Sequence, residues 1–430
     1  MRKKHFLFAS VLALLCGSST LHAQDFKLTS SGYFKNQGVD VMAFDDIYPE
    51  GHQGGVCIIM NGHRVATNGD IRLEATPGQW QPGPKQLDRK LGDNSITATL
   101  CYPDSSRHLT GFNPMIYPDL HLIYTVNVES KGKNIEVTVD LDRPIPQEFI
   151  GKVGFNLEFF PGSLFGKPWI MDGQSGIFPQ QPNSPLMTTQ PNYLHTGNYH
   201  DGKKSLADMD KLIGKGYSPI VADDIISEPY AKGTKFTSRP DDPYNKVTIE
   251  SLSGDLQLFD GRMNHNNGWF VLRSNIKPGV TKGAVKWIIT PNVVADWMYQ
   301  PVIQTSQIGY HPTQDKEAVI EMDIRDNRKE TAQIIRIDAD GEKVVKNVTP
   351  ANWGKFLRYN YLKVNFTDVK EPGLYKIKYN TSVSPIFRID NDVYARGVWQ
   401  PVLEYFLPVQ MCHMRVNEKY RVWHDCCHMD

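Results

Sequence analysis

The chain has no excess of charge of either sign, because 47 Lys and Arg residues balance 47 Asp and Glu residues. Proteins that bind nucleic acid or anionic membrane surfaces usually carry a basic excess, so the balance disfavours both kinds of partner. The sequence also lacks low-complexity tracts and repeats of fixed period, which excludes fibrous and solenoid architectures. At 430 residues it is long enough for two or three domains.

Long hydrophobic runs are absent as well. Near the start, the basic residues 2–4 precede an apolar run from Phe6 to Leu15, which is too short to span a bilayer. Residues 21–23, Leu-His-Ala, form an acceptable cleavage site, so residues 1–23 are predicted to be a signal peptide. No later stretch reaches about 18 apolar residues. We therefore expect an exported protein, periplasmic or extracellular, without a membrane span.

Cysteine is scarce, with six residues in all, and three of them lie in the final segment "MCHMRVNEKYRVWHDCCHMD" (411–430). Cys16 leaves a lipoprotein anchor open, although Leu15 stands where a small residue normally precedes the lipidated cysteine. Five cysteines remain after cleavage, and an odd number means that at least one is not in an intrachain disulfide. Cys57 and Cys101 lie in apolar runs and are expected to be buried thiols.

Residues 24–300 have the pattern of β-strands. Alternating or β-branched runs recur, separated by Gly, Pro, Asn and Asp; they are 94–102, 121–129, 133–142, 153–160, 246–252, 255–259, 268–273 and 284–290. The only fair helical candidate here is "SLADMDKLI" (205–213). One large antiparallel β-sandwich is predicted. The stretch "IEVTVDLDRPIPQEFIGKVGFNLEFFPG" resembles part of a galactose-mutarotase-type supersandwich in rhythm and size.

Residues 161–200 are rich in Pro, Gly, Asn and aromatics and are predicted to form a long ordered loop over the sandwich. Trp169 and Tyr193 are candidate substrate-binding residues, since sugars present C–H patches that pack on aromatic rings. The alternative is an arm that its own aromatic residues pin against the domain.

Residues 301–391 have the length and strand content of an immunoglobulin-like sandwich. In "QIIRIDADGEKV" an Asp-Gly pair predicts a hairpin turn, and "YLKVNFTDV" predicts another strand. After Asp392, a plausible N-cap, apolar residues recur at helical spacing at Tyr394, Val398, Val402 and Tyr405. Pro401 marks a kink or a boundary in that helix.

Four motifs follow one another in the last third of the chain: Gln307-Ile308-Gly309-Tyr310 with Pro312 and Lys316, then "EPGLYKI", "YFLPVQMC" and Cys427-His428. Together they resemble glycoside hydrolase family 9, the inverting cellulases, in the subgroup with an N-terminal immunoglobulin-like domain. Ser306 departs from the usual Asn. The resemblance covers about residues 301–430 and does not reach residues 24–300.

The resemblance implies that residues 392–430 are the truncated start of an (α/α)6 catalytic barrel. The family's catalytic aspartates lie in a D-A-G-D motif and its general acid is a glutamate, and this sequence contains neither motif. Inverting hydrolysis needs two carboxyl groups across the sugar, so no catalytic residue is assigned and the chain is expected to be inactive alone. The implied polymer is a plant or microbial β-glucan, and the implied intramolecular contact joins the immunoglobulin-like domain to the barrel.

The resemblance also implies a structural zinc at Cys412, Cys427 and His428, with the fourth ligand beyond Asp430, so that the site is incomplete here. Thiolates and imidazole are ligands that tetrahedral zinc prefers. His424 is a local substitute for the missing ligand, because it lies four residues before His428. A disulfide between Cys412 and Cys427 is the alternative, as is common in exported proteins.

Two other functions remain open, a non-catalytic carbohydrate-binding module and an extracellular scaffold. A mutarotase site would need histidines and a carboxylate that converge on one sugar. His63, His195, His200 and His265 lie in polar, loop-like sequence, so such a site is not assigned.

Overall fold

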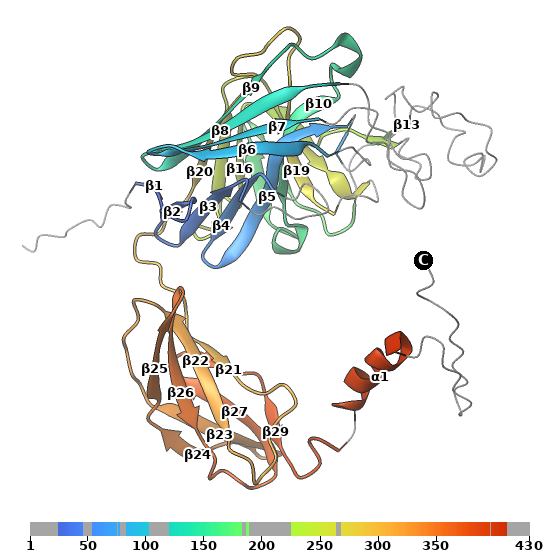
Figure 1. Ribbon diagram of the computed structural model, residues 1–430. Coiled ribbons are helices and arrows are strands. Elements are labelled where there is room, and N and C mark those ends of the chain that lie inside the picture. The colour runs from blue at the N-terminus through green and yellow to red at the C-terminus, as the bar shows by residue number, and fades with distance from the viewer. Residues whose placement is uncertain are drawn as a thin grey trace, which may run out of the picture. The chain divides into compact units, whose positions relative to one another are not determined.

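The computed structural model in Figure 1 describes residues 25–45, 54–74, 76–77, 83–102, 120–182, 186–188, 225–263, 268–395 and 397–410. The chain forms two compact units, Met1–Trp297 and Met298–Asp430. Both are mainly β, as predicted. Within the described ranges, no helix is long and apolar enough to cross a membrane.

The first unit contains two antiparallel sheets of nine strands each among the described residues. In spatial order, one consists of β1 (Lys27–Leu28), β2 (Phe34–Asn36), β3 (Val39–Ala43), β4 (Val56–Met60), β5 (His63–Leu73), β10 (Val153–Phe159), β19 (Phe270–Asn275), β18 (Leu256–Asp260) and β15 (Ala231–Gly233). The other consists of β12 (Gln174–Ile177), β11 (Pro168–Met171), β16 (Lys235–Ser238), β17 (Val247–Ser251), β20 (Val285–Pro291), β9 (Asn134–Leu141), β8 (Ile123–Lys131), β7 (Ser95–Cys101) and β6 (Lys85–Leu91).

The remaining described elements of this unit are short. They are the pair β13 (Leu186–Thr188) and β14 (Ile225–Ser227), and the 3-10 turns η2 (Gln147–Phe149), η3 (Pro161–Ser163) and η5 (Gly261–Met263). Every one of the eight runs predicted as strands overlaps an observed strand: β7, β8, β9, β10, β17, β18, β19 and β20. The predicted helix at 205–213 lies outside the described residues.

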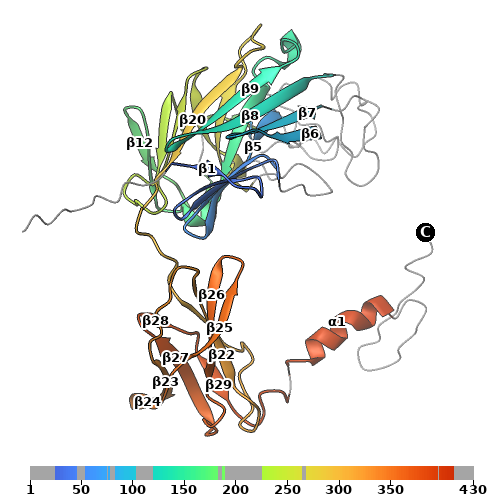
Figure 2. The same ribbon diagram turned by 60° about the vertical axis from the view of Figure 1, so that its left-hand side comes forward.

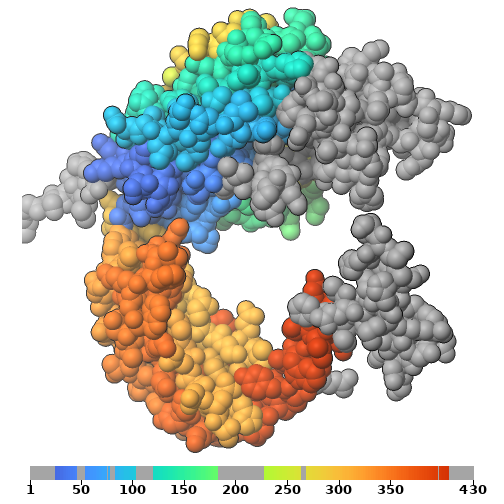
Figure 3. Space-filling view, in the orientation of Figure 1, coloured from blue at the N-terminus to red at the C-terminus, as the bar shows by residue number. Residues whose placement is uncertain are grey.

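The two sheets of the first unit share one hydrophobic core. Strands β7 to β9 bury alternate residues, as expected where one face packs inward. Phe155 of β10 meets Trp287 of β20 edge to face at 4.9 Å, and Phe159 meets Phe236 of β16 at 5.8 Å. These contacts join one sheet to the other, and Figure 2 shows β20, β9 and β8 in a layer distinct from β5. Strand β6, by contrast, lies at the surface (Figure 3).

The segment 161–200 differs from the predicted loop. Within it β11 and β12 form a hairpin, and β11 also pairs with β16, which extends the second sheet. Pairing with β16 satisfies backbone groups that a surface loop would leave to solvent. The many Gly and Pro residues of this segment are typical of loops, so the sequence did not indicate these two strands.

The second unit is a sandwich with its own core. One sheet has the order β21 (Val302–Gln304), β22 (Glu317–Asp323), β26 (Tyr359–Asn365) and β25 (Ala351–Phe356). The other has β24 (Gly341–Val348), β23 (Ala332–Asp338), β27 (Gly373–Tyr379) and β28 (Ser382–Val383), and β29 (Phe387–Ile389) also pairs with β27. The predicted hairpin is confirmed, but its two-residue turn is Ala339-Asp340 and not the Asp-Gly pair, because Gly341 already pairs with Asp338 at the start of β24.

One helix, α1 (Gln400–Gln410), follows the sandwich among the described residues. It begins one residue before Pro401, so this proline marks a helix start, where its missing N–H has no cost. The predicted N-cap at Asp392 is wrong. Residues 391–395 form turns, and the Asp392 carboxylate instead pairs with Arg388 at 2.9 Å.

Candidate functional site

Of the two predicted substrate-binding residues, the structure describes Trp169 alone. Trp169 lies on β11 in the hydrophobic core and is only 6% exposed. Its ring packs over Gly176 of β12, where a Cβ would come within 2.4 Å of the ring. A ring so covered has no face for a sugar, which corrects the assignment of Trp169 and fits the pinned-arm alternative there. Tyr193 lies outside the described residues and stays a prediction.

The predicted metal ligands Cys412, Cys427 and His428, with His424, also lie outside the described residues. Among the residues that the structure does describe, no group of three or more His, Cys, Asp or Glu could hold a metal ion. The zinc site therefore rests on the chemistry of its predicted donors.

A cluster of buried charged residues occupies β5, β10, β19 and the residues next to them. On β5, Ile71 and Leu73 belong to the hydrophobic core, and charged residues alternate with them. Successive side chains of a strand leave it on opposite sides, so the charged ones share the other side. We call the following set the charged cluster: Asn68, Asp70, Arg72, Glu74, Asn156, Glu158 and Arg273, all buried.

Arg273 contacts several members of the charged cluster. Its Nη1 lies 3.2 Å from Glu74 Oε1 and donates to Asn156 Oδ1 at 3.1 Å. Its Nη2 donates to the carbonyl oxygens of Glu74 and Lys152, and its Nε to Asn275 Oδ1 at 2.7 Å. Five polar contacts on one guanidinium tie β19 to β10 and to the end of β5.

Burial shifts the carboxyl groups of the charged cluster toward their neutral forms. Burial raises the pKa of Glu74 to about 7, against the opposing charges of Arg273 and Arg72. It raises the pKa of Asp70 to about 6, although Arg72, the Ile71 N–H and the Tyr124 hydroxyl favour the anion. Both carboxyl groups therefore exchange protons near neutral pH.

The sequence interpretation missed the charged cluster. The stretch "GDIRLE" (69–74) alternates charged and apolar residues, which is the usual pattern of a strand with one face in solvent. In the structure both faces of β5 are buried from Val65 onward. Charged residues on a strand with two buried faces would have indicated the cluster. Whether the second face is buried, however, depends on the tertiary structure and cannot be read from the sequence.

In the second unit, the motif around residue 309 closes the sandwich. Gly309 has φ +104, and a Cβ there would lie 2.3 Å from the Arg388 carbonyl oxygen. The Tyr310 N–H donates to that same oxygen at 2.9 Å, and the Tyr310 hydroxyl donates to the Glu317 carbonyl at 3.1 Å. Only glycine allows two backbones to approach this closely, so the motif is structural.

Lys316 completes this closure. It is fully buried, and its Nζ donates to the carbonyl oxygens of Pro312 at 2.9 Å, Gln314 at 3.0 Å and His311 at 3.4 Å. Burial lowers the pKa of Lys316, and the positive charge of Lys370 adds to that effect. The ammonium group thus replaces solvent for three loop carbonyls.

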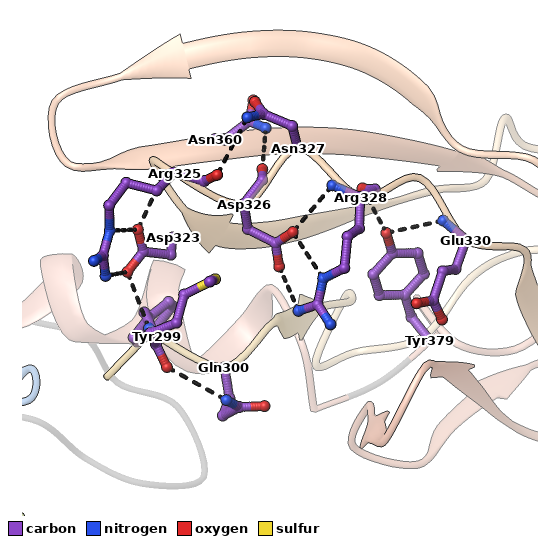
Figure 4. A network of polar contacts seen from close by, with 11 residues as sticks. Tyr299, Gln300, Asp323, Arg325, Asp326, Asn327, Arg328, Glu330, Asn360 and Tyr379 are labelled. Carbon is purple, nitrogen blue, oxygen red and sulfur yellow. Dashed lines mark hydrogen bonds and ion pairs between the residues drawn. The ribbon is translucent and has the colours of Figure 1, made fainter. Parts of the chain in front are cut away.

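The connection from β22 to β23 is held by two ion pairs (Figure 4). Asp323 binds Arg325 at 2.7 Å, and Asp326 binds Arg328 at 2.7 Å. Burial opposes ionisation of Asp323, but hydrogen bonds from Arg325 and from the Tyr299 N–H lower its pKa to about 2. Figure 4 also shows Tyr379 accepting from the Glu330 N–H and donating to the Arg328 carbonyl. These contacts fix the loop and engage both aspartates in ion pairs.

The outer side of the sheet β22–β26–β25 carries aromatic residues. Tyr359 and Tyr361 alternate with the buried Asn360 and Leu362 on β26. We call the following set the aromatic face: Tyr299, Trp353, Phe356, Tyr359 and Tyr361. Glu321 accepts hydrogen bonds from Tyr299 and Tyr361 at 3.0 and 3.1 Å.

Two members of the aromatic face are more than half exposed, Trp353 at 55% and Phe356 at 58%. The chain neighbours of Trp353, Asn352 and Gly354, line a shallow polar hollow together with Asn327, Arg328, Lys329, Lys355, Asn360 and Leu362. Because Asn360 and Leu362 alternate with Tyr359 and Tyr361 on β26, this hollow lies on the other side of the sheet from the aromatic face. The exposed rings by themselves form an apolar surface able to contact a partner.

Residues 298–384 match the family model of the cellulase N-terminal Ig-like domain. Over these residues, the second unit is similar to the Ig-like domain that precedes the catalytic part of cellulases. The motif that closes the sandwich, from Gln307 to Lys316, lies within the matched residues.

Among solved structures, the chain is similar to a metagenome-derived glycoside hydrolase family 9 endoglucanase, with 25% identity over 28% of this chain and a TM-score of 0.22. A family 9 protein of Bacteroides ovatus has 23% identity over 28% of this chain and a TM-score of 0.21. The chain covers 23% and 20% of the lengths of these two relatives.

The Slr1438 protein from Synechocystis sp. PCC 6803 has 10% identity and a TM-score of 0.30, over 68% of this chain and 100% of that one. No curated protein matches the chain.

Proposed function

We propose that this chain forms the non-catalytic portion, ahead of the barrel, of an exported family 9 glycoside hydrolase that cleaves β-glucan with inversion. The observation that carries this proposal is the match of residues 298–384 to the cellulase N-terminal Ig-like domain. Inversion needs an acid and a base carboxyl group about 6.5–9.5 Å apart. In this proposal the barrel supplies both groups, and residues 24–391 supply none.

The role proposed for the Ig-like domain is to stabilise the barrel by covering its first helix. Trp399, Val402, Leu403 and Tyr405, in and next to α1, are each more than half exposed. Large apolar side chains at the start of a helix support packing against further helices. Contact with the Ig-like domain would add to that burial.

Two measurements test this proposal. The purified chain should release no reducing sugar from cellulose, mixed-linkage glucan or xyloglucan. The coding DNA after codon 430 should encode, in some frame, a helical segment that bears D-A-G-D. Hydrolysis by the chain, or an unrelated gene after codon 430, would contradict the proposal.

For export, we expect the N-terminus of the secreted protein to be Gln24, after cleavage behind Ala23. Mass spectrometry of the secreted protein measures this directly. A mature chain that begins at a lipidated Cys16 would instead establish the anchor.

The zinc site belongs to the same proposal. Cys412, Cys427 and His428 supply two thiolates and an imidazole, a donor set that suits structural zinc, which would cross-link the start of the barrel. Metal analysis of the purified protein should detect zinc that Cys412→Ser and Cys427→Ser remove. Loss of free thiols in the denatured, unreduced protein would identify a Cys412–Cys427 disulfide in its place.

The aromatic face favours a second candidate function, binding of polysaccharide by the Ig-like domain. Trp353→Ala should weaken retention on insoluble cellulose or xyloglucan if this face stacks on sugar rings. Trp399→Ala is a matched control, since Trp399 is 54% exposed and Trp353 is 55% exposed. Equal retention of both variants and the wild type would exclude this role, and no retention at all would favour a scaffold.

A further inference from the structure

The polar hollow of the second unit has a volume of about 260 Å³. One wall comes from the connection between β22 and β23, with Asn327, Arg328 and Lys329. The other wall comes from β25 and β26, and its residues are Asn352, Gly354, Lys355, Asn360 and Leu362. The lining residues include three cations and no acidic residue, so we call this site the cationic hollow.

Hydrogen bonds hold both walls of the cationic hollow in place. The Asp326 carboxylate accepts from Arg328 Nε at 2.9 Å and from Arg328 Nη2 at 2.7 Å (Figure 4). From the opposite wall, Asn360 Nδ2 donates to the Asp326 carbonyl oxygen at 2.8 Å. The loop and β26 are therefore joined directly. A site that is formed in advance loses less entropy on binding than one that the ligand must order.

The cations of the hollow have donors that the described part of the chain does not use. Asp326 engages Nε and Nη2 of Arg328, and among the described residues nothing accepts from the remaining Nη1. Lys329 and Lys355 are exposed, and neither forms an ion pair or a side-chain hydrogen bond with any residue that the structure describes. Because Asp326 neutralises Arg328, the two lysines account for the net positive charge of the hollow.

This charge restricts the ligand. A cation would be repelled, and a monocarboxylate would neutralise only one of the two ammonium groups. A dianion balances both of them, and Arg328 Nη1 adds a donor whose position is fixed. Charge-assisted hydrogen bonds to an oxyanion are roughly twice as strong as neutral ones, which is why Arg and Lys recur in phosphate sites.

From these observations we infer that the cationic hollow is a binding site for a tetrahedral dianion, either a free phosphate or sulfate ion or the phosphate group of an ester. Lys329 and Lys355 neutralise the ligand, and Arg328 Nη1 donates to one of its oxygens. Exposed charges contribute little each, so we expect a dissociation constant on the order of 1 mM. The proposed function does not use this site, so failure of the inference would leave that proposal unchanged.

Isothermal calorimetry of the full chain at pH 8 and constant ionic strength measures the binding. Phosphate esters are dianions at this pH, because their second pKa is about 6. Inorganic phosphate, sulfate and methyl phosphate are titrated separately, and acetate is the monoanion for comparison. At least one dianion should bind in a saturable way and at least ten times more tightly than acetate. Binding of methyl phosphate would identify an ester as a possible source, whereas binding of phosphate or sulfate alone would identify the free ion.

Two variants and a control locate the binding. Lys329→Gln and Lys355→Gln each remove one charge, so each should weaken binding at least threefold, and the double variant at least tenfold. Lys343→Gln, at an exposed position of β24 outside the hollow, is the matched control and should keep the affinity of the wild type. Absence of saturable binding by every dianion, equal affinity for acetate, or wild-type affinity in the double variant would overturn the inference.

Thermal unfolding separates binding from a general effect of salt. Sulfate and phosphate stabilise folded proteins without any site, because they are excluded from the protein surface. That contribution to Tm should be the same in the wild type and in the Lys329→Gln/Lys355→Gln double variant. A bound dianion adds a further rise in Tm with the logarithm of its concentration, by mass action, in the wild type. Equal rises in the two proteins would overturn the inference.

Discussion

At the residue scale, buried charge in this protein is stabilised by backbone oxygens as much as by opposite charge. Lys316 has three carbonyl partners, and Arg273 has two carbonyls besides Glu74, Asn156 and Asn275. Hydrogen bonds to a charged donor are stronger than neutral ones, and their loss leaves buried acceptors unsatisfied. Single substitutions at these two positions should therefore be costly.

Replacement of Lys316 with methionine tests this directly. Methionine keeps most of the side-chain volume but removes all three donors, so Lys316→Met should reduce the free energy of unfolding of the Ig-like domain by roughly 2–3 kcal/mol. For a domain of this size, Tm should fall by about 10 °C or more. Lys343→Met, at an exposed position, is the control. Equal melting temperatures of the two variants would show that the buried ammonium is dispensable.

Glu74 gives a prediction about pH. Its pKa is about 7 in the folded protein and near 4.5 when unfolded, so the folded state holds a proton that the unfolded chain has lost. The free energy of unfolding should therefore fall as pH rises from about 4.5 to 7. In Glu74→Gln, that fall between pH 5 and 8 should be smaller by roughly 3 kcal/mol.

Urea denaturation at several pH values measures this slope. Glu148→Gln, which removes one exposed carboxylate from η2, is the matched control for the charge change. The slope rather than the absolute stability is compared, because Glu74→Gln also takes a partner from Arg273. Parallel pH profiles for the wild type and Glu74→Gln would contradict the shifted pKa.

At the element scale, the Ig-like sandwich depends on the close approach of residue 309 to β29. Tyr310 forms an isolated bridge with Ile389, and the Asp390 N–H donates to the Tyr310 carbonyl at 3.1 Å. Tyr310 also packs edge to face on Phe366 and Phe387 at 5.1 and 5.3 Å. The start and the end of the domain are thereby joined.

Gly309→Ala should disrupt this junction. It combines an unfavourable φ with a clash against backbone, so we expect a loss of about 3 kcal/mol or more in unfolding free energy. Gly341→Ala separates the two effects, since Gly341 has φ +132 but no atom within 4 Å of a Cβ; it should lose about 1 kcal/mol. Equal losses would mean that the close approach to Arg388 contributes nothing.

The agreement between predicted and observed elements differs from one element to the next, and each case has a physical reason. Runs such as 133–142 alternate strictly and match β9, because one face packs on the core and the other does not. The hairpin β11–β12 was missed because its stability comes from pairing with β16, some sixty residues later in the chain. The start of α1 was misplaced at Asp392, since helical spacing alone does not show that Arg388 pairs with this residue.

At the scale of the whole molecule, each unit has its own hydrophobic core. The boundary falls between Trp297 and Met298. The core of the Ig-like domain draws on both of its sheets, for example Ile320 and Leu362 from one and Ile334 and Ile377 from the other. A core of this kind meets the requirement for independent folding.

Residues 298–395 expressed alone should therefore unfold in one cooperative transition, measured by calorimetry and circular dichroism. A fragment of residues 298–365 is the control, because it lacks β27, which pairs with β23 along its length. This control should remain unfolded. An unfolded 298–395 fragment would show that the Ig-like domain needs the rest of the chain.

The sequence by itself determined the β-rich fold class, the strand runs of the first unit and the Ig-like character of the second. Period-two alternation and the short motif from Gln307 to Lys316 are local patterns, so they can be read without knowledge of contacts. Only the tertiary structure decided that Trp169 is buried and that Asp70, Arg72 and Glu74 meet Glu158 and Arg273 in one cluster. Burial and long-range pairing depend on which surfaces meet, and strands β5 and β19 are separated by about two hundred residues. The same alternation that predicts a strand therefore leaves open whether its second face meets solvent or protein.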